Sequence, residues 1–234
     1  MNVCIFGDSI GKGIILDSVS KKYKSLKFDL MKPFSLLKDV SLKNYSKFGC
    51  TVTKGISIIE RYAKELVGYD VALLEYGGND CNFLWNEIAL APDKEHNPNT
   101  PIETFINTYK QAIKKIQEAG VQPVLLTLPP LHAKRFLNWV SKEVDSINIL
   151  KWLGGEDMIY RWQEMYSLAI FKLSSKLGVP VVDIRSAFLC RQDLPELICE
   201  DGMHPTSKGY ELIVETVCCG MTRFHKSAEQ LIQC

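Results

Sequence analysis

Short continuous runs of apolar residues recur along the chain, and each stops at a glycine, a proline or a polar turn. They cover residues 3–6, 71–74, 124–128 and 179–184. Continuous rather than alternating runs are typical of strands that are buried on both faces, as in a parallel sheet. Residues 42–48 alternate weakly and predict a further strand that ends at Gly49.

The segments between these runs have apolar residues at helical spacing. Thr100, Pro101 and Glu103 combine a cap, a first-turn proline and an acidic residue, which indicates the start of a helix. Gly120 ends it. Further helices are predicted over residues 34–38, 53–66, 158–177 and 210–219. Because strands and helices alternate without a repeat or a Gly/Ser linker, we predict one α/β domain over residues 1–234, with a mainly parallel sheet between layers of helices.

Polar or glycine-rich turns follow three of the predicted strands. Ser9 follows the first strand, Gly49 the second and Asn79 the third. In an open α/β sheet, ligands bind in the crevice beyond the carboxyl ends of the strands. We therefore expect the three residues at one site, where the hydroxyl group of Ser9 has the position of a nucleophile.

A polar turn near the end of the chain contains Asp201 and His204. Acyl transfer by a serine needs a base, a group that orients the base, and donors for the developing oxyanion. Asp201 can contact one ring nitrogen of His204 and leave the other nitrogen facing Ser9. The backbone N–H groups of Ser9 and Gly49, with the side-chain amide of Asn79, can supply the oxyanion donors. A glycine at position 49 leaves room for the substrate.

The order of these motifs resembles the SGNH (GDSL-type) hydrolase family. The blocks of that family are a serine in a Gly-Asp-Ser turn, a glycine, an asparagine in Gly-x-Asn-Asp, and Asp-x-x-His near the C-terminus. All four stand here in order, and the match spans residues 2–217. The resemblance implies a flavodoxin-like three-layer α/β/α sandwich (the SGNH hydrolase fold), and hydrolysis of esters or thioesters without a cofactor.

The same resemblance assigns a role to each motif residue. It implies that Ser9 is the nucleophile and that His204 and Asp201 complete the catalytic triad. It also implies that Ser9, Gly49 and Asn79 form the oxyanion hole. Any one of these residues alone is more simply explained as a turn, a cap or a packed side chain, but all four motifs together require four coincidences.

Two other functions compete with a serine esterase. A non-catalytic binding protein on the same fold would be indicated by a missing triad member, and none is missing. Glycoside hydrolysis requires a pair of catalytic carboxyl groups. Asp8 and Asp80 flank the site, and we interpret them as turn and scaffold residues, which disfavours that chemistry.

Substrate contacts are expected from residues near the site-forming turns. Phe83 and Trp85 follow Asn79 closely, and His132 follows the end of another predicted strand, although a surface position is the alternative for His132. Apolar residues at helical spacing predict one amphipathic helix over residues 136–147. The wider segment 133–153 then forms a lid, a subunit contact or plain packing on the body.

Two substrate classes remain open for the predicted esterase. Glycine-rich turns close to the acyl carbon, with no extended apolar groove in the sequence, favour short acyl esters of small alcohols or sugars. The alternative is a lysophospholipase or acyl thioesterase that acts on longer acyl chains.

Composition and charge limit the classes of binding partner and the cellular compartment that we expect for this protein. A net charge of +1 gives no general attraction to nucleic acid, and no apolar run reaches the ~20 residues of a membrane-spanning helix. Four scattered histidines and the lack of a C-x-x-C pair predict no metal site. The first residues lack the segments of a secretory signal, and the eight cysteines do not suggest a disulfide framework. We predict a reduced, cytoplasmic protein that acts on a small-molecule ester.

Overall fold

Parallel strands form the central sheet of the structure, a computed structural model that describes residues 1–26 and 40–232. The strand order is β4-β1-β5-β6-β7, and every pairing between neighbours is parallel. The strands are β4 (Ser41–Asn44), β1 (Asn2–Gly7), β5 (Val71–Glu75), β6 (Gln122–Leu126) and β7 (Val181–Val182). The mainly parallel sheet is therefore confirmed, and Ser9 lies just beyond the carboxyl end of β1.

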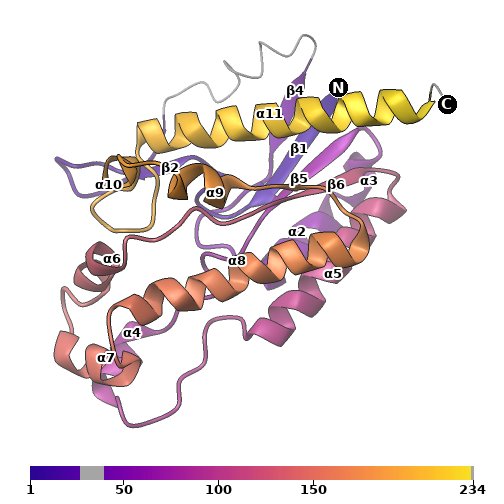
Figure 1. Ribbon diagram of the computed structural model, residues 1–234. Helices are drawn as coiled ribbons and strands as arrows, with labels where there is room; N and C mark the ends of the chain where they lie inside the picture. The colour runs from indigo at the N-terminus through magenta and orange to yellow at the C-terminus, as the bar shows by residue number, and fades with distance from the viewer. Residues whose placement is uncertain (27–39, 233–234) are drawn as a thin grey trace.

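Helices cover both faces of the sheet (Figure 1). The main helices are α2 (Val52–Arg61), α5 (Ile102–Glu118) and α8 (Asp157–Leu177) on one face and α11 (Ser207–Ile232) on the other. In β1, Cys4 and Phe6 pack with the first layer, whereas Val3 and Ile5 pack with α11. Because both sets are apolar, the strand sequences are continuously apolar. The predicted three-layer α/β/α sandwich is confirmed.

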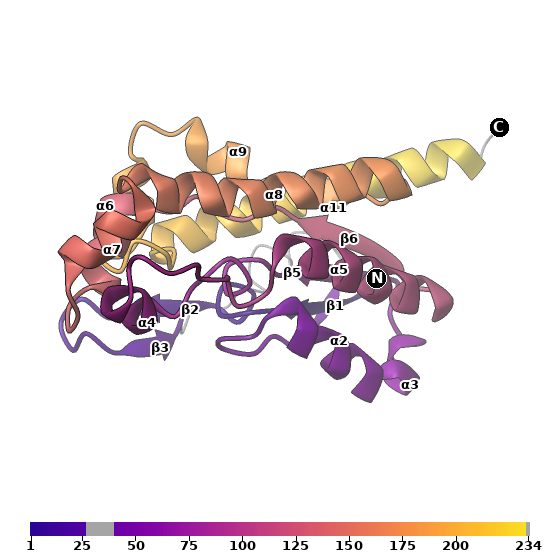
Figure 2. The ribbon, with the colours of Figure 1, turned by 90° about the horizontal axis from the view of Figure 1, so that it is seen from below.

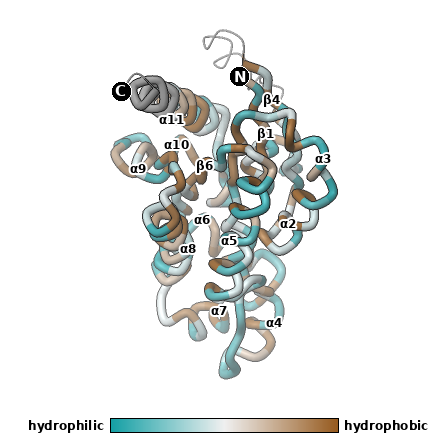
Figure 3. The backbone as a smooth tube through the Cα atoms, turned by 90° about the vertical axis from the view of Figure 1, so that its right-hand side faces the viewer, coloured by the Kyte–Doolittle hydropathy of each residue, from teal (hydrophilic) through white to brown (hydrophobic). Residues whose placement is uncertain are grey.

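A third apolar cluster lies away from the sheet and is built by α4 (Trp85–Leu90), α6 (Ala133–Val140) and α7 (Ser146–Leu153). Figures 1 and 2 both place these short helices at one end of the molecule, next to the start of α8. Phe83, Phe136 and Ile159 are buried in this cluster. In Figure 3, apolar and polar colours alternate along α5, as expected of a helix that buries one side and exposes the other.

The single helix predicted over residues 136–147 is wrong, because the segment forms two helices. Helix α6 ends at Val140, and α7 begins at Ser146. The carboxylate of Asp145 accepts the backbone N–H groups of Ile147 at 2.8 Å and Asn148 at 3.4 Å. Such a cap satisfies donors that the first helical turn leaves open, and it favours the start of a new helix.

Other elements differ from their predicted bounds. The strand predicted over residues 179–184 is restricted to β7, because Asp183 caps α9 (Ile184–Leu189) by accepting the N–H group of Ser186 at 3.0 Å. The helix predicted over residues 53–66 divides at Tyr62 into α2 and α3 (Ala63–Leu66). The helix predicted over residues 34–38 lies outside the described residues.

The sequence did not predict the antiparallel pair of β2 (Ile14–Leu16) and β3 (Tyr23–Ser25), or the short helix α10 (Leu194–Leu197). The hairpin lies at the same end of the molecule as α4, α6 and α7 (Figure 2). It brings Tyr23 to His204, with 4.9 Å between the ring centroids. Among the helices in the described ranges, none has the length and apolarity needed to cross a membrane.

Candidate active site

Ser9 lies in a tight turn directly after β1. The Asp8 carboxylate stabilises this turn by accepting the N–H group of Ile10 at 2.8 Å. The carbonyl oxygen of Ser9 accepts the N–H group of Ile14, the first residue of β2, at 2.9 Å. The turn is therefore held on both sides, and it fixes the position of a nearly buried serine hydroxyl group.

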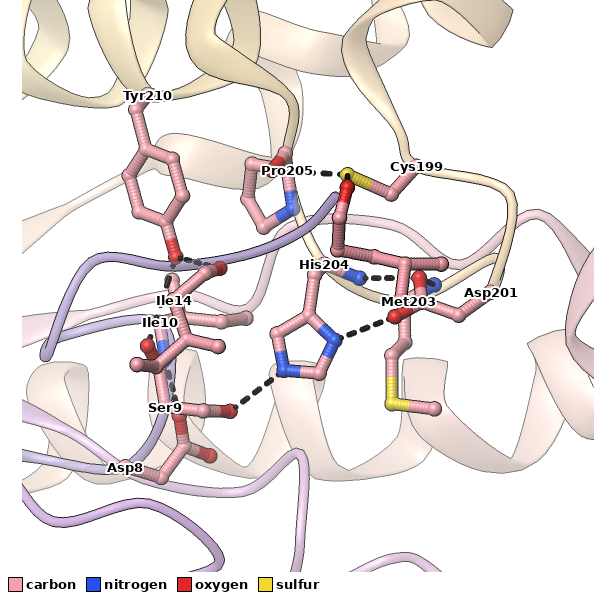
Figure 4. A network of polar contacts seen from close by, with 11 residues as sticks. Asp8, Ser9, Ile10, Ile14, Cys199, Asp201, Met203, His204, Pro205 and Tyr210 are labelled. Carbon is pink, nitrogen blue, oxygen red and sulfur yellow. Dashed lines mark hydrogen bonds and ion pairs between the residues drawn. The ribbon is translucent and has the colours of Figure 1, made fainter. Parts of the chain in front are cut away.

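The imidazole ring of His204 connects Ser9 to Asp201 (Figure 4). Its Nε2 atom lies 3.0 Å from Ser9 Oγ, and its Nδ1 atom lies 2.7 Å from Asp201 Oδ2. The other carboxylate oxygen, Oδ1, accepts the N–H groups of Met203 and His204, both at 3.0 Å. Because a carboxylate faces Nδ1, this nitrogen carries the ring hydrogen, and Nε2 is free to accept a proton from Ser9.

The turn that carries Asp201 and His204 packs against the start of α6. Gly202, between them, has φ +74°, and a Cβ atom at this position would lie 2.3 Å from the backbone nitrogen of Phe136. The N–H group of His132 donates to the carbonyl oxygen of Gly202 at 2.8 Å. Only glycine fits both the left-handed backbone and the close contact, so Gly202 helps to fix the geometry of the site.

Asp201 is completely buried, and it is nevertheless held in its ionised form. Burial opposes the charge, but the hydrogen bond and charge of His204 and the N–H groups of Met203 and His204 outweigh burial and lower the pKa of Asp201. A carboxylate in this position stabilises the imidazolium ring that forms when His204 accepts a proton.

Gly49 and Asn79 line the same cavity as Ser9. Within residues 1–26 and 40–232, the N–H groups of Ser9 and Gly49 donate to no protein acceptor. Asn79 donates one amide hydrogen to Asp8 Oδ2 at 2.9 Å, which leaves the second for a ligand. Gly49 has φ +67° with no atom within 4 Å of a Cβ position, so its left-handed backbone, not crowding within the protein, explains the glycine.

Glu75, at the end of β5, lies behind the Ser9 turn. Its Oε2 atom accepts the N–H groups of Asp8 at 3.2 Å and Gly11 at 2.9 Å. Burial, followed by the negative charge of Asp8, raises the pKa of Glu75 well above its ordinary value. Glu75 was not predicted from the sequence, although a charged residue at the end of an apolar strand is a signal that identifies such a position.

Asp80 connects the Asn79 turn to α2. Its two carboxylate oxygens accept the N–H group of Val52 at 3.0 and 3.1 Å. Burial raises the pKa of Asp80 to about 7. These contacts agree with the interpretation of Asp80 as a scaffold residue.

Comparison with known families identifies the relatives of this chain. A model described as the GDSL-like lipase/acylhydrolase family matches residues 5–212. The chain belongs to this family. The predictions of an SGNH/GDSL-type hydrolase and of an enzyme that cleaves ester bonds are thereby confirmed.

Solved structures of GDSL-type hydrolases and related enzymes share the fold of this chain. A lipase/acylhydrolase from Enterococcus faecalis is 20% identical, with a TM-score of 0.62 and 92% of each chain covered. A catalytic mutant of an acetylxylan esterase from Geobacillus stearothermophilus is 15% identical, with a TM-score of 0.63 and coverage of 94% of this chain and 93% of that one. An α/β hydrolase from the metagenome of Lake Arreo, Spain, is 16% identical, with a TM-score of 0.65 and 94% of each chain covered. A search of curated proteins found no significant match.

In this GDSL-type hydrolase, Ser9 and His204 line a cavity of about 370 Å³. The predicted contact residues Phe83 and Trp85 line it as well. His132 is not among the lining residues. Its ring instead caps α6, with Nδ1 accepting the N–H group of Arg135 at 3.5 Å.

Several cavity residues were not singled out from the sequence as substrate contacts. Tyr23 and Phe48 flank His204, and the Phe48 ring lies parallel to the imidazole with 6.3 Å between centroids. Trp162 comes from α8 and contacts Phe83. Tyr23 occurs in a lysine-rich segment without a recognisable strand pattern, so no local signal indicated its position beside the histidine.

Proposed function

We propose that the whole chain, residues 1–234, acts as one catalytic domain that hydrolyses carboxylic esters through an acyl-enzyme on Ser9. The observation that carries this proposal is the continuous hydrogen-bonded chain from Ser9 through His204 to Asp201, next to a cavity. This intact set argues against a non-catalytic binding protein on the same fold.

The first half of the reaction acylates the serine. Ser9 Oγ attacks the carbonyl carbon of the ester while its proton moves to Nε2 of His204. The N–H groups of Ser9 and Gly49 and the amide of Asn79 donate to the oxyanion of the tetrahedral intermediate. His204 then gives its proton to the oxygen of the departing alcohol, and the acyl group stays on Ser9.

The second half of the reaction releases the acid. A water molecule loses a proton to Nε2 of His204 and attacks the acyl carbon from the side that the alcohol has left. Collapse of the second intermediate breaks the bond to Ser9 Oγ, which takes the proton back from His204. Throughout, the ionised Asp201 orients the ring and balances its positive charge.

The substrate predicted from the sequence is a short acyl ester of a small alcohol or sugar, with a lysophospholipase or acyl thioesterase as the alternative. All of these substrates use the same chemistry at Ser9. The cavity of about 370 Å³ exceeds the volume that an acetyl group requires, which favours a larger acyl group. A cytoplasmic location stays a prediction, and the cysteines in the described part of the chain are free.

Labelling with a fluorophosphonate probe tests the proposed nucleophile. The wild type should be labelled at Ser9, and Ser9→Ala should show neither labelling nor hydrolysis of p-nitrophenyl butyrate. Ser57→Ala, which changes an exposed serine on α2, is the matched control and should be labelled like the wild type. Labelling that persists in Ser9→Ala would contradict the assignment.

A further inference from the structure

The cavity next to Ser9 is walled by aromatic rings that come from separate elements. Phe83 is at their centre, with its ring centroid 5.0 Å from Trp152, 5.6 Å from Trp85 and 5.6 Å from Trp162. Phe136 of α6 extends this wall, 5.8 Å from Trp85. The rings are tilted or edge-on to one another, a packing that aromatic side chains prefer, so the wall is a firm apolar surface.

Asn82 and Gln163 in this wall already have protein partners, whereas the buried indole N–H group of Trp162 has none in the described part of the chain. The Oδ1 atom of Asn82 accepts the N–H group of Phe83 at 3.0 Å and the indole N–H group of Trp85 at 2.8 Å. Gln163 donates to the carbonyl oxygen of Pro129 at 2.9 Å and accepts from Arg185 at 2.8 Å. A sugar in this part of the cavity would lose hydrogen bonds to water with few replacements, whereas a hydrocarbon chain would gain from burial.

The position of His204 determines which part of the ester faces the wall. His204 Nε2 must deliver a proton to the oxygen of the leaving alcohol, so the alcohol lies on the histidine side of Ser9. There, Tyr23 and the half-exposed Phe48 flank the imidazole. The acyl group points the other way, past Asn79, and Phe83 and Trp85 follow Asn79 along the chain and line the cavity.

We infer that the aromatic cavity binds the acyl group and that the preferred substrates are esters of unbranched, medium-length fatty acids. This inference rests on the proposed function, and it replaces the short acyl preference expected from the sequence. A volume of about 370 Å³ equals on the order of a dozen liquid-water volumes of roughly 30 Å³ each. Part of this volume lies beside Tyr23 and Phe48 and takes the alcohol, so the remainder holds an acyl chain of roughly six to eight carbons.

A p-nitrophenyl ester series from acetate to decanoate measures the acyl preference directly. For the wild type, kcat/KM should rise with each added methylene, by up to about fourfold per step, and should peak at hexanoate or octanoate. In Ile159→Trp the new indole fills part of the cavity, so the optimum should move to acetate or butyrate. In Trp152→Ala the cavity is enlarged, so the optimum should move to decanoate.

Ile147→Trp is the matched control, because Ile147 is 75% exposed on α7 and lies outside the cavity. Its profile should equal that of the wild type. A wild-type optimum at acetate, or an optimum that neither cavity variant moves, overturns the inference. If thermal unfolding shows that Ile159→Trp is not folded, the profile of Trp152→Ala alone decides.

Fluorophosphonate labelling separates the two proposals. A labelled protein without the expected chain-length profile refutes only the cavity assignment, whereas an unlabelled wild type refutes the proposed nucleophile.

Discussion

Ser9 lies between two systems of buried carboxyl groups that have opposite ionisation preferences. On one side is Asp201 beside His204, and on the other is Asp8, with Glu75 behind it (Figure 4 shows Asp8 and Asp201). Asp201 and Glu75 are both at most 1% exposed. Yet the pKa of Asp201 is lowered, whereas burial raises the pKa of Glu75. Burial alone therefore does not determine the charge of a carboxyl group here.

The difference arises from the partners of each group. Asp201 accepts two backbone N–H groups and faces a ring that becomes cationic during the proposed reaction. Glu75 accepts N–H groups on Oε2 only, and its Oε1 atom has no hydrogen-bond partner in the described part of the chain. After burial, the carboxyl group of Asp8 contributes most to its raised pKa. Burial raises the pKa of Asp8 as well. Because two neighbouring buried carboxyl groups oppose each other's ionisation, we infer that the pair keeps one proton on Glu75, and Asp8 accepts the hydrogen bond of Asn79.

Asp201→Asn removes the carboxylate that faces His204 and should have the largest effect on catalysis. The new side chain keeps its oxygen toward the N–H groups of Met203 and His204, so its NH₂ group faces Nδ1 of the ring. Nδ1 must then act as acceptor, and Nε2 carries the hydrogen and cannot take the serine proton. We expect kcat to fall on the order of 10⁴-fold with the fold retained.

Steady-state kinetics with p-nitrophenyl butyrate and circular dichroism check this expectation. Asp93→Asn, at a largely exposed aspartate that pairs with Lys151, is the control and should leave kcat unchanged. A folded Asp201→Asn variant with kcat near that of the wild type would restrict Asp201 to a structural role.

Asn79→Ala removes the amide group that donates to Asp8, on the other side of Ser9, and should have a smaller effect on catalysis. The substitution removes one proposed oxyanion donor and leaves those of Ser9 and Gly49, so kcat should fall by about 10²–10³-fold, or ~3–4 kcal/mol, with KM little changed. Asn99→Ala is the control, because Asn99 only holds the backbone of Asn79 by donating to its carbonyl oxygen at 2.9 Å. An equal loss in both variants would assign the effect to loop position instead of to the amide donor.

The site also shows how much of the structure could be predicted from the sequence. Continuous apolar runs located the strands, because residues such as Val3 and Phe6 meet opposite helical layers. The motif residues Ser9 and His204 follow strand ends or precede a helix, where local patterns are strong. Their convergence at 3.0 Å depends on the fold.

What the sequence could not predict depends on contacts between distant segments. Tyr23 reaches His204 only through a hairpin that lacks a clear alternating pattern. The break between α6 and α7 depends on a single cap at Asp145, within an apolar pattern that continues across it. Glu75 was visible as a charge at a strand end, but its raised pKa depends on Asp8, which is 67 positions away in the sequence.

Glu75→Gln tests whether Glu75, unlike Asp201, is protonated. Of the three substitutions, it should have the smallest effect on catalysis. A glutamine keeps an oxygen for the N–H groups of Asp8 and Gly11, and its amide replaces the protonated half of the acid, so kcat should change only a few-fold.

The effect on stability should depend on pH. In the wild type, the folded protein keeps a proton on Glu75 that the unfolded chain releases above the ordinary pKa of 4.5. The stabilising contribution of Glu75 is therefore complete below that pH and is lost as the pH rises toward the raised folded-state pKa, by up to about 1.4 kcal/mol per pH unit.

Chemical denaturation of both proteins across this range should show the variant gaining stability relative to the wild type as pH rises. The difference between the two curves removes contributions that they share, such as that of Asp80 with its pKa of about 7. Glu211→Gln, at an exposed glutamate on α11, should give a curve parallel to the wild type. Parallel curves for Glu75→Gln as well would mean that Glu75 holds no extra proton, and that Asp201 and Glu75 do not differ in their ionisation.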